Sequence, residues 1–268
     1  MWFKKWIQHG NTISHLCSIS GHSSRKMRYI IDYWLGQVPG ANNQRIARCR
    51  YSIFDGTFLD RPDSVVVIMD AQDRSVIASS YPVRETSVKQ LRTFLGGLKE
   101  DGLSLVSVTL DGNPQAIMTF RQLWPGITIQ RCLVHIQRQG LMWCRAKPQT
   151  ELAKQLRELF VRTTYIRTPG QRDNFVRDLN RWENKYGEEV ENFPSGHKTL
   201  SDLRRARSMI IKALPDMFHY LDNSNIPFST NSLEGYYSRL KWAYRNHRGM
   251  AIHKRINYFK WYTILKQI

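Results

Sequence analysis

The sequence predicts a mixed α/β protein in which a sheet layered with helices is followed by a block of helices alone. Short β-branched or partly alternating segments lie between residues 51 and 130, and helical spacings separate them. Beyond Pro148 the strand-like segments stop, and helical spacing continues to about residue 222. A chain of 268 residues can bury one core and carry a smaller extra domain.

Two short helices joined by a tight turn are expected at the N-terminus. Residues 12–19 and 23–35 have helical spacing, and Ser20-Gly21-His22 interrupts it. Ser23 or His22 can cap the second helix, whose first turns are basic. A helix-turn-helix places such a helix in the major groove of DNA, and the alternative is a helical hairpin with a solvated basic face. The apolar face is predicted to contain Met27, Ile30, Ile31 and Trp34, and the DNA contacts are predicted to be Ser23, Ser24, Arg25, Lys26 and Arg28.

The remaining elements follow in order along the chain. Residues 36–48 are rich in Gly, Pro and Asn and are predicted to be a linker. Asn113-Pro114 has the residue types of a helix cap and a first helical position. Strands are expected at 51–58, 64–69, 75–80, 103–110 and 128–130, and helices at 85–100, from 113, from about 132, at 149–162, 171–187 and 199–222, and from 231.

The charge of the chain predicts a polyanionic partner. There are 40 Lys and Arg residues against 22 Asp and Glu, for a formal net charge of +18 and a pI near 10.0. Nucleic acid fits best, because each phosphate contact releases condensed counterions. An anionic membrane surface and a ribosomal position are the alternatives, although the aromatic content of 12% is high for a ribosomal protein.

Cysteine usage and the absence of apolar runs point to a reducing compartment. The four cysteines form no CxxC pair and no regular disulfide spacing. The first ten residues lack the apolar region of a signal peptide, and no run approaches the roughly 18 apolar residues of a membrane span. We therefore expect a cytoplasmic, nucleoid-associated protein with no membrane role.

Three acidic residues stand out in this basic chain. Asp55 lies in the first predicted strand, Asp111 closes the fourth, and Glu234 is near the start of the last helix. Strand ends are where open α/β sheets bind ligands, and three such carboxylates can hold two Mg²⁺ ions for phosphoryl transfer. Each has a structural alternative: Asp-Gly is a common turn, and Glu234 can serve as a capping-box residue for Asn231.

The helix that begins at Asn231 has two different faces. Its apolar face is predicted to be buried, and the opposite face has Glu234 at its start and cations behind it. That row can hold a DNA backbone whose scissile phosphate lies beside the carboxylate, and the alternative is an ordinary amphipathic helix. The apolar face comprises Leu233, Tyr237, Leu240 and Tyr244, and the polar face comprises Glu234, Ser238, Lys241, Arg245 and Arg248.

Four segments in this order resemble the Mutator-like (MULE-type) DDE transposases of bacterial insertion sequences, over about residues 50–250. YSIFDGTFLD contains Asp55 at the position of the first aspartate, and LVSVTLDGNPQAI contains Asp111 at the second. TIQRCLVHIQRQ has Cys132 and His135 at the positions of the C/D-x2-H signature. STNSLEGYYSRLKWAYRNHRGM contains Glu234 at the position of the catalytic glutamate.

The resemblance implies an RNase H-like core interrupted by an all-helical insertion. The interval between Asp111 and Glu234 is too long for a minimal core of that type. The expected domains are a helix-turn-helix at 1–40, the first part of the core at 48–147, the insertion at 148–226 and the final core helices at 227–268.

The resemblance also assigns roles to two further positions. Cys132 and His135 are expected to order the active site or to contact DNA, and a zinc site with Cys144 or a distant His is the alternative. Trp182 is similar to an aromatic residue of related insertions that can stack on an unpaired base. Its place on a helical stripe with Phe175, Leu179 and Tyr186 favours core packing instead.

The implied function is metal-dependent cleavage at transposon ends, followed by strand transfer into target DNA. The expected cofactor is Mg²⁺, with Mn²⁺ as a possible substitute, and the expected partner is double-stranded DNA: the terminal inverted repeats and the target. A homodimer or higher oligomer is expected on DNA. The alternatives are an RNase H or junction resolvase, and an inactive, truncated or domesticated transposase that only binds DNA. Further DNA contacts are expected from Arg131, Arg239, Lys241, Arg245 and Arg248.

Overall fold

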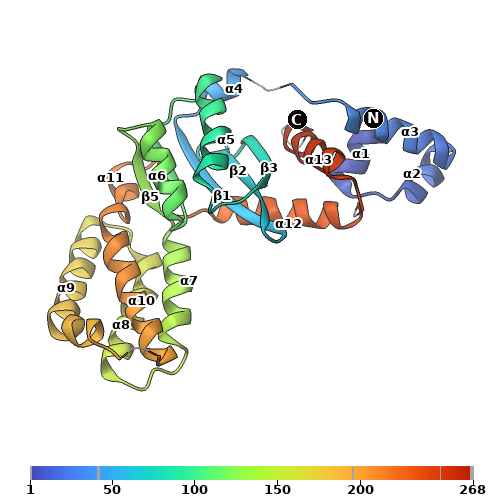
Figure 1. Ribbon diagram of the computed structural model, residues 1–268. Helices are drawn as coiled ribbons and strands as arrows, with labels where there is room; N and C mark the ends of the chain where they lie inside the picture. Colours follow the sequence, from blue (N-terminus) through green and yellow to red (C-terminus); the bar gives the residue numbers. More distant parts are fainter. Residues whose placement is uncertain (1, 41–42, 195, 248, 266–268) are drawn as a thin grey trace. The chain divides into compact units, whose positions relative to one another are not determined.

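The computed structural model describes residues 2–40, 43–194, 196–247 and 249–265 (Figure 1). The chain divides into two compact units, which are described separately. Unit 1 comprises Met1–Val106, Asn113–Ile127 and Asn231–Ile268. Unit 2 comprises Ser107–Gly112 and Thr128–Thr230. The helix-turn-helix, core and insertion boundaries stay predictions.

An antiparallel meander of three strands forms the sheet of unit 1. The strands are β1 (Tyr51–Asp60), β2 (Asp63–Asp70) and β3 (Val76–Val83), with Asp55 paired to Val67. β2 is buried almost throughout, as its run of Val and Ile predicts. The three predicted strands are confirmed. β1 and β2 extend beyond their expected bounds, and β3 begins at residue 76 instead of 75 and continues to residue 83.

Helices α5 (Val88–Glu100) and α6 (Pro114–Leu123) pack against each other in unit 1. The Asn113 side chain caps α6 by accepting from the backbone N–H of Gln115, 3.0 Å away, which confirms the predicted Asn-Pro start. The prediction that α5 starts at residue 85 is wrong, because the helix starts at Val88. Ser87 is its N-cap, so residues 84–87 form the connection from β3.

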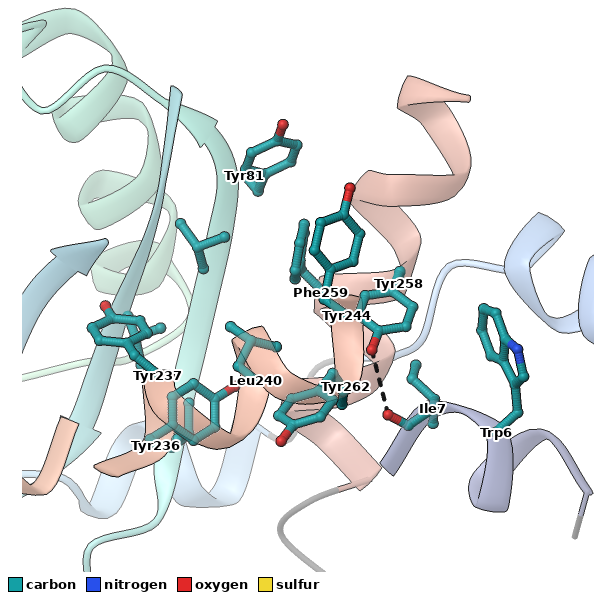
Figure 2. Packing of buried hydrophobic residues seen from close by; sticks show 14 of the residues in the cluster. Trp6, Ile7, Tyr81, Tyr236, Tyr237, Leu240, Tyr244, Tyr258, Phe259 and Tyr262 are labelled. Carbon is teal, nitrogen blue, oxygen red and sulfur yellow. Dashed lines mark hydrogen bonds between the residues drawn. The ribbon is translucent and has the colours of Figure 1, made fainter. Parts of the chain in front are cut away.

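An aromatic core joins both ends of the chain within unit 1. It packs α1 (Trp2–His9), α2 (Ile13–Ser20) and α3 (Ser24–Gly36) with α12 (Asn231–Arg245) and α13 (Ile252–Leu265). Figure 2 shows Trp6 and Ile7 beside the tyrosines of the last two helices, with the Tyr258 hydroxyl donating to the Ile7 carbonyl at 3.4 Å. Burying phenol rings in this way removes a large apolar area from water. The Tyr236 hydroxyl is 3.1 Å from the Thr263 hydroxyl, whereas the buried Tyr262 hydroxyl has no hydrogen-bond partner among the described residues.

The α2–α3 pair has the caps that the sequence predicts. Gly21 adopts a left-handed conformation with φ of +69° at the end of α2, and the Ser23 hydroxyl accepts from the Lys26 backbone N–H at 3.3 Å. The predicted apolar face of α3 is partly wrong. Leu35 is buried with Met27 and Ile31, whereas Trp34 is 38% exposed and Ile30 is half-buried. A helix-turn-helix stays a prediction for this pair.

The predicted linker at 36–48 is wrong in its second half, because α4 spans Asn43–Arg48. Ile46 of this helix is 2% exposed, and the Cys49 that follows is fully buried. One apolar anchor is enough to hold a short helix against its neighbours, although the surrounding composition is typical of a loop.

Unit 2 combines two parallel strands with the helical block that the sequence predicts. β4 (Ser107–Leu110) pairs with β5 (Thr128–Arg131), and α7 (Leu133–Cys144) packs against α8 and α10. The helix predicted at 199–222 is interrupted at Leu214-Pro215. The strand predicted at 103–110 is β4, which starts at residue 107. The remaining elements are α8 (Glu151–Arg162), η1 (Thr163–Tyr165), α9 (Pro169–Glu191), α10 (Lys198–Ala213), η2 (Leu214–Asp216) and α11 (His219–Asp222).

The core of unit 2 depends on one close helix contact and one buried indole. A Cβ at Gly140 would lie 2.1 Å from the Phe160 ring, so only glycine lets α7 and α8 approach so closely. Trp182 is 3% exposed, and its Nε1–H donates to the Leu152 carbonyl at 2.9 Å. The core-packing interpretation of Trp182 is therefore confirmed.

The fold is mixed α/β, as predicted. Among the described residues, three strands belong to unit 1 and two belong to unit 2. Antiparallel pairing joins β1 to β2 and β2 to β3, and parallel pairing joins β4 to β5.

Candidate active site

Asp55 was predicted to lie at a strand end. It lies instead in the middle of β1, three residues before Phe58. The strand is longer than its alternating segment suggests, because its pairing with β2 continues to Asp60. Asp55 is half-buried, and one carboxylate oxygen accepts from the Gly56 backbone N–H at 2.9 Å. Its position is therefore determined by a paired strand on which the backbone has little freedom.

Tyr237 of α12 connects that helix to β1 at Asp55. The buried Tyr237 hydroxyl donates to the Asp55 carbonyl at 2.5 Å. Burial, reinforced by the negative charges of Asp55 and Glu85, raises the pKa of the Tyr237 phenol well above its ordinary value. The phenol is therefore neutral, and it remains a hydrogen-bond donor across the physiological pH range.

Glu234 is in the first turn of α12, three residues before Tyr237. Residues three apart are neighbours on a helix surface, so the half-buried Glu234 is next to the residue that contacts Asp55. Asp55 and Glu234 both belong to unit 1, and their convergence on one site stays a prediction. The predicted apolar face of the helix, which includes Leu233, Leu240 and Tyr244, is buried and confirmed.

A further acid near Asp55, Glu85, was missed by sequence reasoning. Its carboxylate lies over Gly56, where an added Cβ would be 2.4 Å from the carboxyl carbon. Its charge acts with that of Asp55 on the Tyr237 hydroxyl. The expected helix at 85–100 concealed it, because a glutamate in a first helical turn has an ordinary structural explanation. The glycine at position 56 was the available signal.

Asp111 follows the last residue of β4 directly, in unit 2, so its predicted place at a strand end is confirmed. Arg131 ends the neighbouring parallel strand β5. Its guanidinium lies over Gly112, where an added Cβ would be 2.3 Å from Nη2. Burial lowers the pKa of Arg131, while the charges of Asp111 and Asp216 act in the opposite direction. Arg131 is thus a buried cation close to Asp111.

Cys132 and His135 form a cluster with Thr230 in unit 2. Cys132 is the N-cap residue of α7, and its sulfur accepts from the Thr230 backbone N–H at 3.3 Å. The Thr230 hydroxyl is 3.6 Å from that sulfur and 3.4 Å from His135 Nδ1. Sequence reasoning quoted Thr230 within a motif but assigned it no role. The cluster therefore connects the third and fourth motifs through the residue that precedes α12.

The thiol of Cys132 differs electrostatically from the other buried thiols. Burial alone disfavours its thiolate, but hydrogen bonding and the charge of His135, helped by Thr230, more than offset this and lower the pKa of Cys132. Burial raises the pKa of Cys144 to about 12, and the charge of Arg157 offsets only part of that effect. Thr230, which contacts both Cys132 and His135, has a hydroxyl side chain that is not a usual zinc ligand.

The chemistry of the acids suits a hard divalent cation. Carboxylate oxygens are the preferred ligands of Mg²⁺, and Asp55, Asp111, Glu234 and Glu85 supply them. Within the residues that the structure describes, no three His, Cys, Asp or Glu side chains are gathered closely enough to hold a metal. Asp55 and Glu234 belong to unit 1 and Asp111 to unit 2, so a shared site for the three is part of the proposal below.

The predicted DNA contacts differ in exposure. On α3 the basic side chains are exposed, and Ser23 uses its hydroxyl as a helix cap. Arg131 is only 9% exposed and is directed at Gly112 beside Asp111, so its role as a DNA contact stays a prediction. Arg248 lies outside the described residues. The exposed candidates are Ser24, Arg25, Lys26, Arg28, Arg239 and Arg245, and Lys241 is half-buried.

Comparison with known proteins identifies the family to which the chain belongs. Residues 65–249 match the family described as "Transposase, Mutator family". The match covers more than half of the chain, which therefore belongs to the Mutator family of transposases. Asp111, Cys132, His135 and Glu234 lie inside the matched region, and Asp55 precedes it.

A search of curated proteins finds no match. Among the described residues, no helix is both long and apolar enough to cross a membrane.

Proposed function

We propose that this chain is a DDE transposase that cleaves DNA at transposon ends and joins them to target DNA. The observation that carries the proposal is the first turn of α12, which in a Mutator-family chain brings Glu234 next to the Tyr237 that contacts Asp55. Asp111, at the end of β4, is the third acid of the proposed set. DNA is the proposed partner, and the protein is proposed to bind it as a homodimer or higher oligomer.

Asp55, Asp111 and Glu234 are the residues that would hold Mg²⁺ or Mn²⁺. When bound, such a pair of cations activates the attacking oxygen and stabilises the leaving oxygen of an in-line phosphoryl displacement. The chain itself supplies the positions of these acids. Tyr237 fixes the backbone at Asp55 and stays neutral, so it adds no further negative charge to the acidic pair.

Two other groups are proposed to position the acids. Arg131 offsets part of the charge of Asp111 from a buried position at the end of the neighbouring strand. Cys132 and His135 hold Thr230, four residues before Glu234. The start of α12 is thereby restrained on its N-terminal side, and a positioned carboxylate is what a metal site needs.

The proposed DNA contacts lie outside the catalytic set. The exposed basic start of α3 is proposed to read or clamp duplex DNA, as the second helix of a helix-turn-helix does. The exposed cations of α12 are proposed to hold the backbone on the C-terminal side of Glu234. We place the protein on the nucleoid for the same reason: its charge of +18 favours DNA over other partners.

The test uses a supercoiled plasmid carrying the gene together with its own flanking DNA, so the end sequence need not be known beforehand. With Mg²⁺ present, the wild-type protein is expected to nick or linearise it. Asp55→Asn, Asp111→Asn and Glu234→Gln are each expected to lower the rate about a thousandfold, because each removes a ligand charge from the metal site. Binding of the same plasmid, measured by gel shift in EDTA, is expected to change less than about twofold.

Glu100→Gln and Glu189→Gln are matched controls, since both acids are exposed and neither belongs to the proposed set. Both are expected to cleave at the wild-type rate. Cleavage by the Asp111→Asn variant at the control rate would remove Asp111 from the site. A wild-type protein that binds the plasmid and never cuts it would instead be a DNA-binding remnant of a transposase.

A further inference from the structure

A pocket of about 470 Å³ lies within unit 1, where the end of β1 meets the last turns of α12 and the start of α13. It is separate from the acidic residues described above, none of which lines it. Its volume is within the range of pockets that hold small organic ligands. It is lined by Phe58, Leu59, Lys241, Tyr244, Arg245, Gly249 and Arg255.

The pocket is strongly basic. Lys241, Arg245 and Arg255 carry positive charge, and none of the seven described residues that line it is acidic. The Arg255 guanidinium donates to the Tyr81 hydroxyl at 2.9 Å, and this hydrogen bond holds the guanidinium in position at the side of the pocket. Three cations around one concavity raise the local concentration of anions, and phosphate is the anion that a DNA-processing protein meets.

An exposed aromatic ring accompanies this charge. Phe58 is 46% exposed at the end of β1, and the Arg61 guanidinium stacks over its ring at 5.0 Å. One exposed aromatic residue is ordinary on a protein surface. A ring beside three cations and under a fourth is the combination that binds single-stranded nucleic acid, because bases stack on the ring while cations follow the backbone.

We propose that this pocket binds an unpaired nucleotide of the DNA being cut, with its base on Phe58 and its phosphates on Lys241 and Arg245. The proposal rests on the proposed function in one respect, which is that cleavage occurs near Glu234. Lys241 and Arg245 are about 10 and 16 Å from Glu234 along α12. At about 3.4 Å per nucleotide, the bound nucleotide lies roughly three to five positions from the cut.

The same geometry gives the pocket a specific use. Strand cleavage leaves a free end, and a stacked, unpaired base a few nucleotides away holds that strand in place. Base stacking is tolerant of sequence, because every base has an aromatic face. The pocket is therefore expected to prefer single strands over duplex and to show little sequence preference.

The test measures binding by fluorescence anisotropy in EDTA, where no cleavage can occur. The probes are a labelled oligo-dT and a labelled duplex of the same length. Phe58→Ala is expected to weaken oligo-dT binding about 5- to 100-fold, the loss of one base–aromatic stack, while duplex binding changes less than about twofold. Phe58→Tyr is expected to restore oligo-dT binding. Trp242→Ala is the matched control, because Trp242 is 56% exposed on α12 outside the pocket, and it should bind both probes normally.

Lys241→Gln with Arg245→Gln supplies the second readout. The affinity for oligo-dT should fall. The slope of the logarithm of the binding constant against the logarithm of the salt concentration should become less steep by about 0.7 for each phosphate contact removed. Wild-type oligo-dT binding by Phe58→Ala overturns the proposal, as does an equal loss in Trp242→Ala. Failure of the proposed function is separable, because Asp55→Asn and Glu234→Gln should lose cleavage and keep oligo-dT binding, and neither side chain lines the pocket.

Discussion

Asp55 and Asp111 have the same side chain but opposite surroundings. Asp55 shares unit 1 with Glu85 and with the neutral hydroxyl of Tyr237. Asp111 lies in unit 2 near the buried guanidinium of Arg131. The first acid therefore has another carboxylate near it, whereas the second has a buried cation near it.

The difference shows how a single ligand type can serve two electrostatic purposes. Where two carboxylates are neighbours, an added cation relieves their mutual repulsion. A carboxylate with a protein cation beside it is held in place without one. Three substitutions sharpen or break this comparison, in decreasing order of expected effect.

The largest effect is expected from Arg131→Met. Removing the buried cation leaves Asp111 and Asp216 without its charge, and we expect a loss of about 3 kcal/mol in the free energy of unfolding. Urea unfolding monitored by circular dichroism measures it. Arg205→Met is the control, because the Arg205 side chain is 64% exposed and 3.7 Å from Asp202 and should contribute less than about 1 kcal/mol. Equal losses in the two variants would mean that Arg131 is not a compensating charge.

The second test compares Gly112→Ala with Gly56→Ala. At position 112 the new methyl meets the Arg131 guanidinium at 2.3 Å, and at position 56 it meets the Glu85 carboxyl carbon at 2.4 Å. Arg131 is buried and cannot withdraw, so about 1–3 kcal/mol is expected at 112. Glu85 is half-buried and can rotate away, so less than about 1 kcal/mol is expected at 56. Thermal unfolding of both variants checks the order, and the reverse order would contradict the comparison.

The smallest effect is expected from Tyr237→Phe, which removes the hydroxyl that donates to the Asp55 carbonyl. A loss of about 1 kcal/mol is expected at neutral pH. The raised pKa of Tyr237 also gives a sign for the pH dependence. Its contribution is complete below the ordinary tyrosine pKa of about 10 and is lost as the pH rises toward the folded value, since the unfolded phenol ionises first.

The variant should therefore lose less stability than the wild type between neutral pH and pH of about 11. Chemical unfolding at several pH values measures this. Tyr29→Phe, with Tyr29 71% exposed, is the control and should follow the wild-type curve. A Tyr237→Phe curve parallel to the wild type above pH 10 would show that the hydroxyl is not held protonated by burial.

Local patterns predicted those elements whose residues interact mainly with their sequence neighbours. The strand at 64–69, the Ser23 and Asn113 caps and the apolar face of α12 all agree with the structure. Caps and periodicity depend on contacts within a few residues, so the sequence contains the necessary information. The mixed α/β class follows from the same local signals.

Long-range packing decided the rest. The helix at Asn43–Arg48 forms in a segment of loop-like composition, and Pro215 divides a segment with continuous helical spacing. Asp55 lies inside its strand because pairing with β2 extends to Asp60. Glu85 was hidden because its contact with Gly56 spans two elements that no local pattern connects.

For the candidate site, the sequence alone determined the chemistry: a strongly basic chain, three acids in a family-specific order, and a Cys-His pair at helical spacing. Only the tertiary structure decided the environment of each group. It buried Arg131 near Asp111, placed the Tyr237 hydroxyl on the Asp55 backbone, and joined Cys132 to Thr230. The reason is that residue type sets which charge or hydrogen bond is available, whereas burial and the nearest neighbours, which come from distant parts of the chain, set its strength.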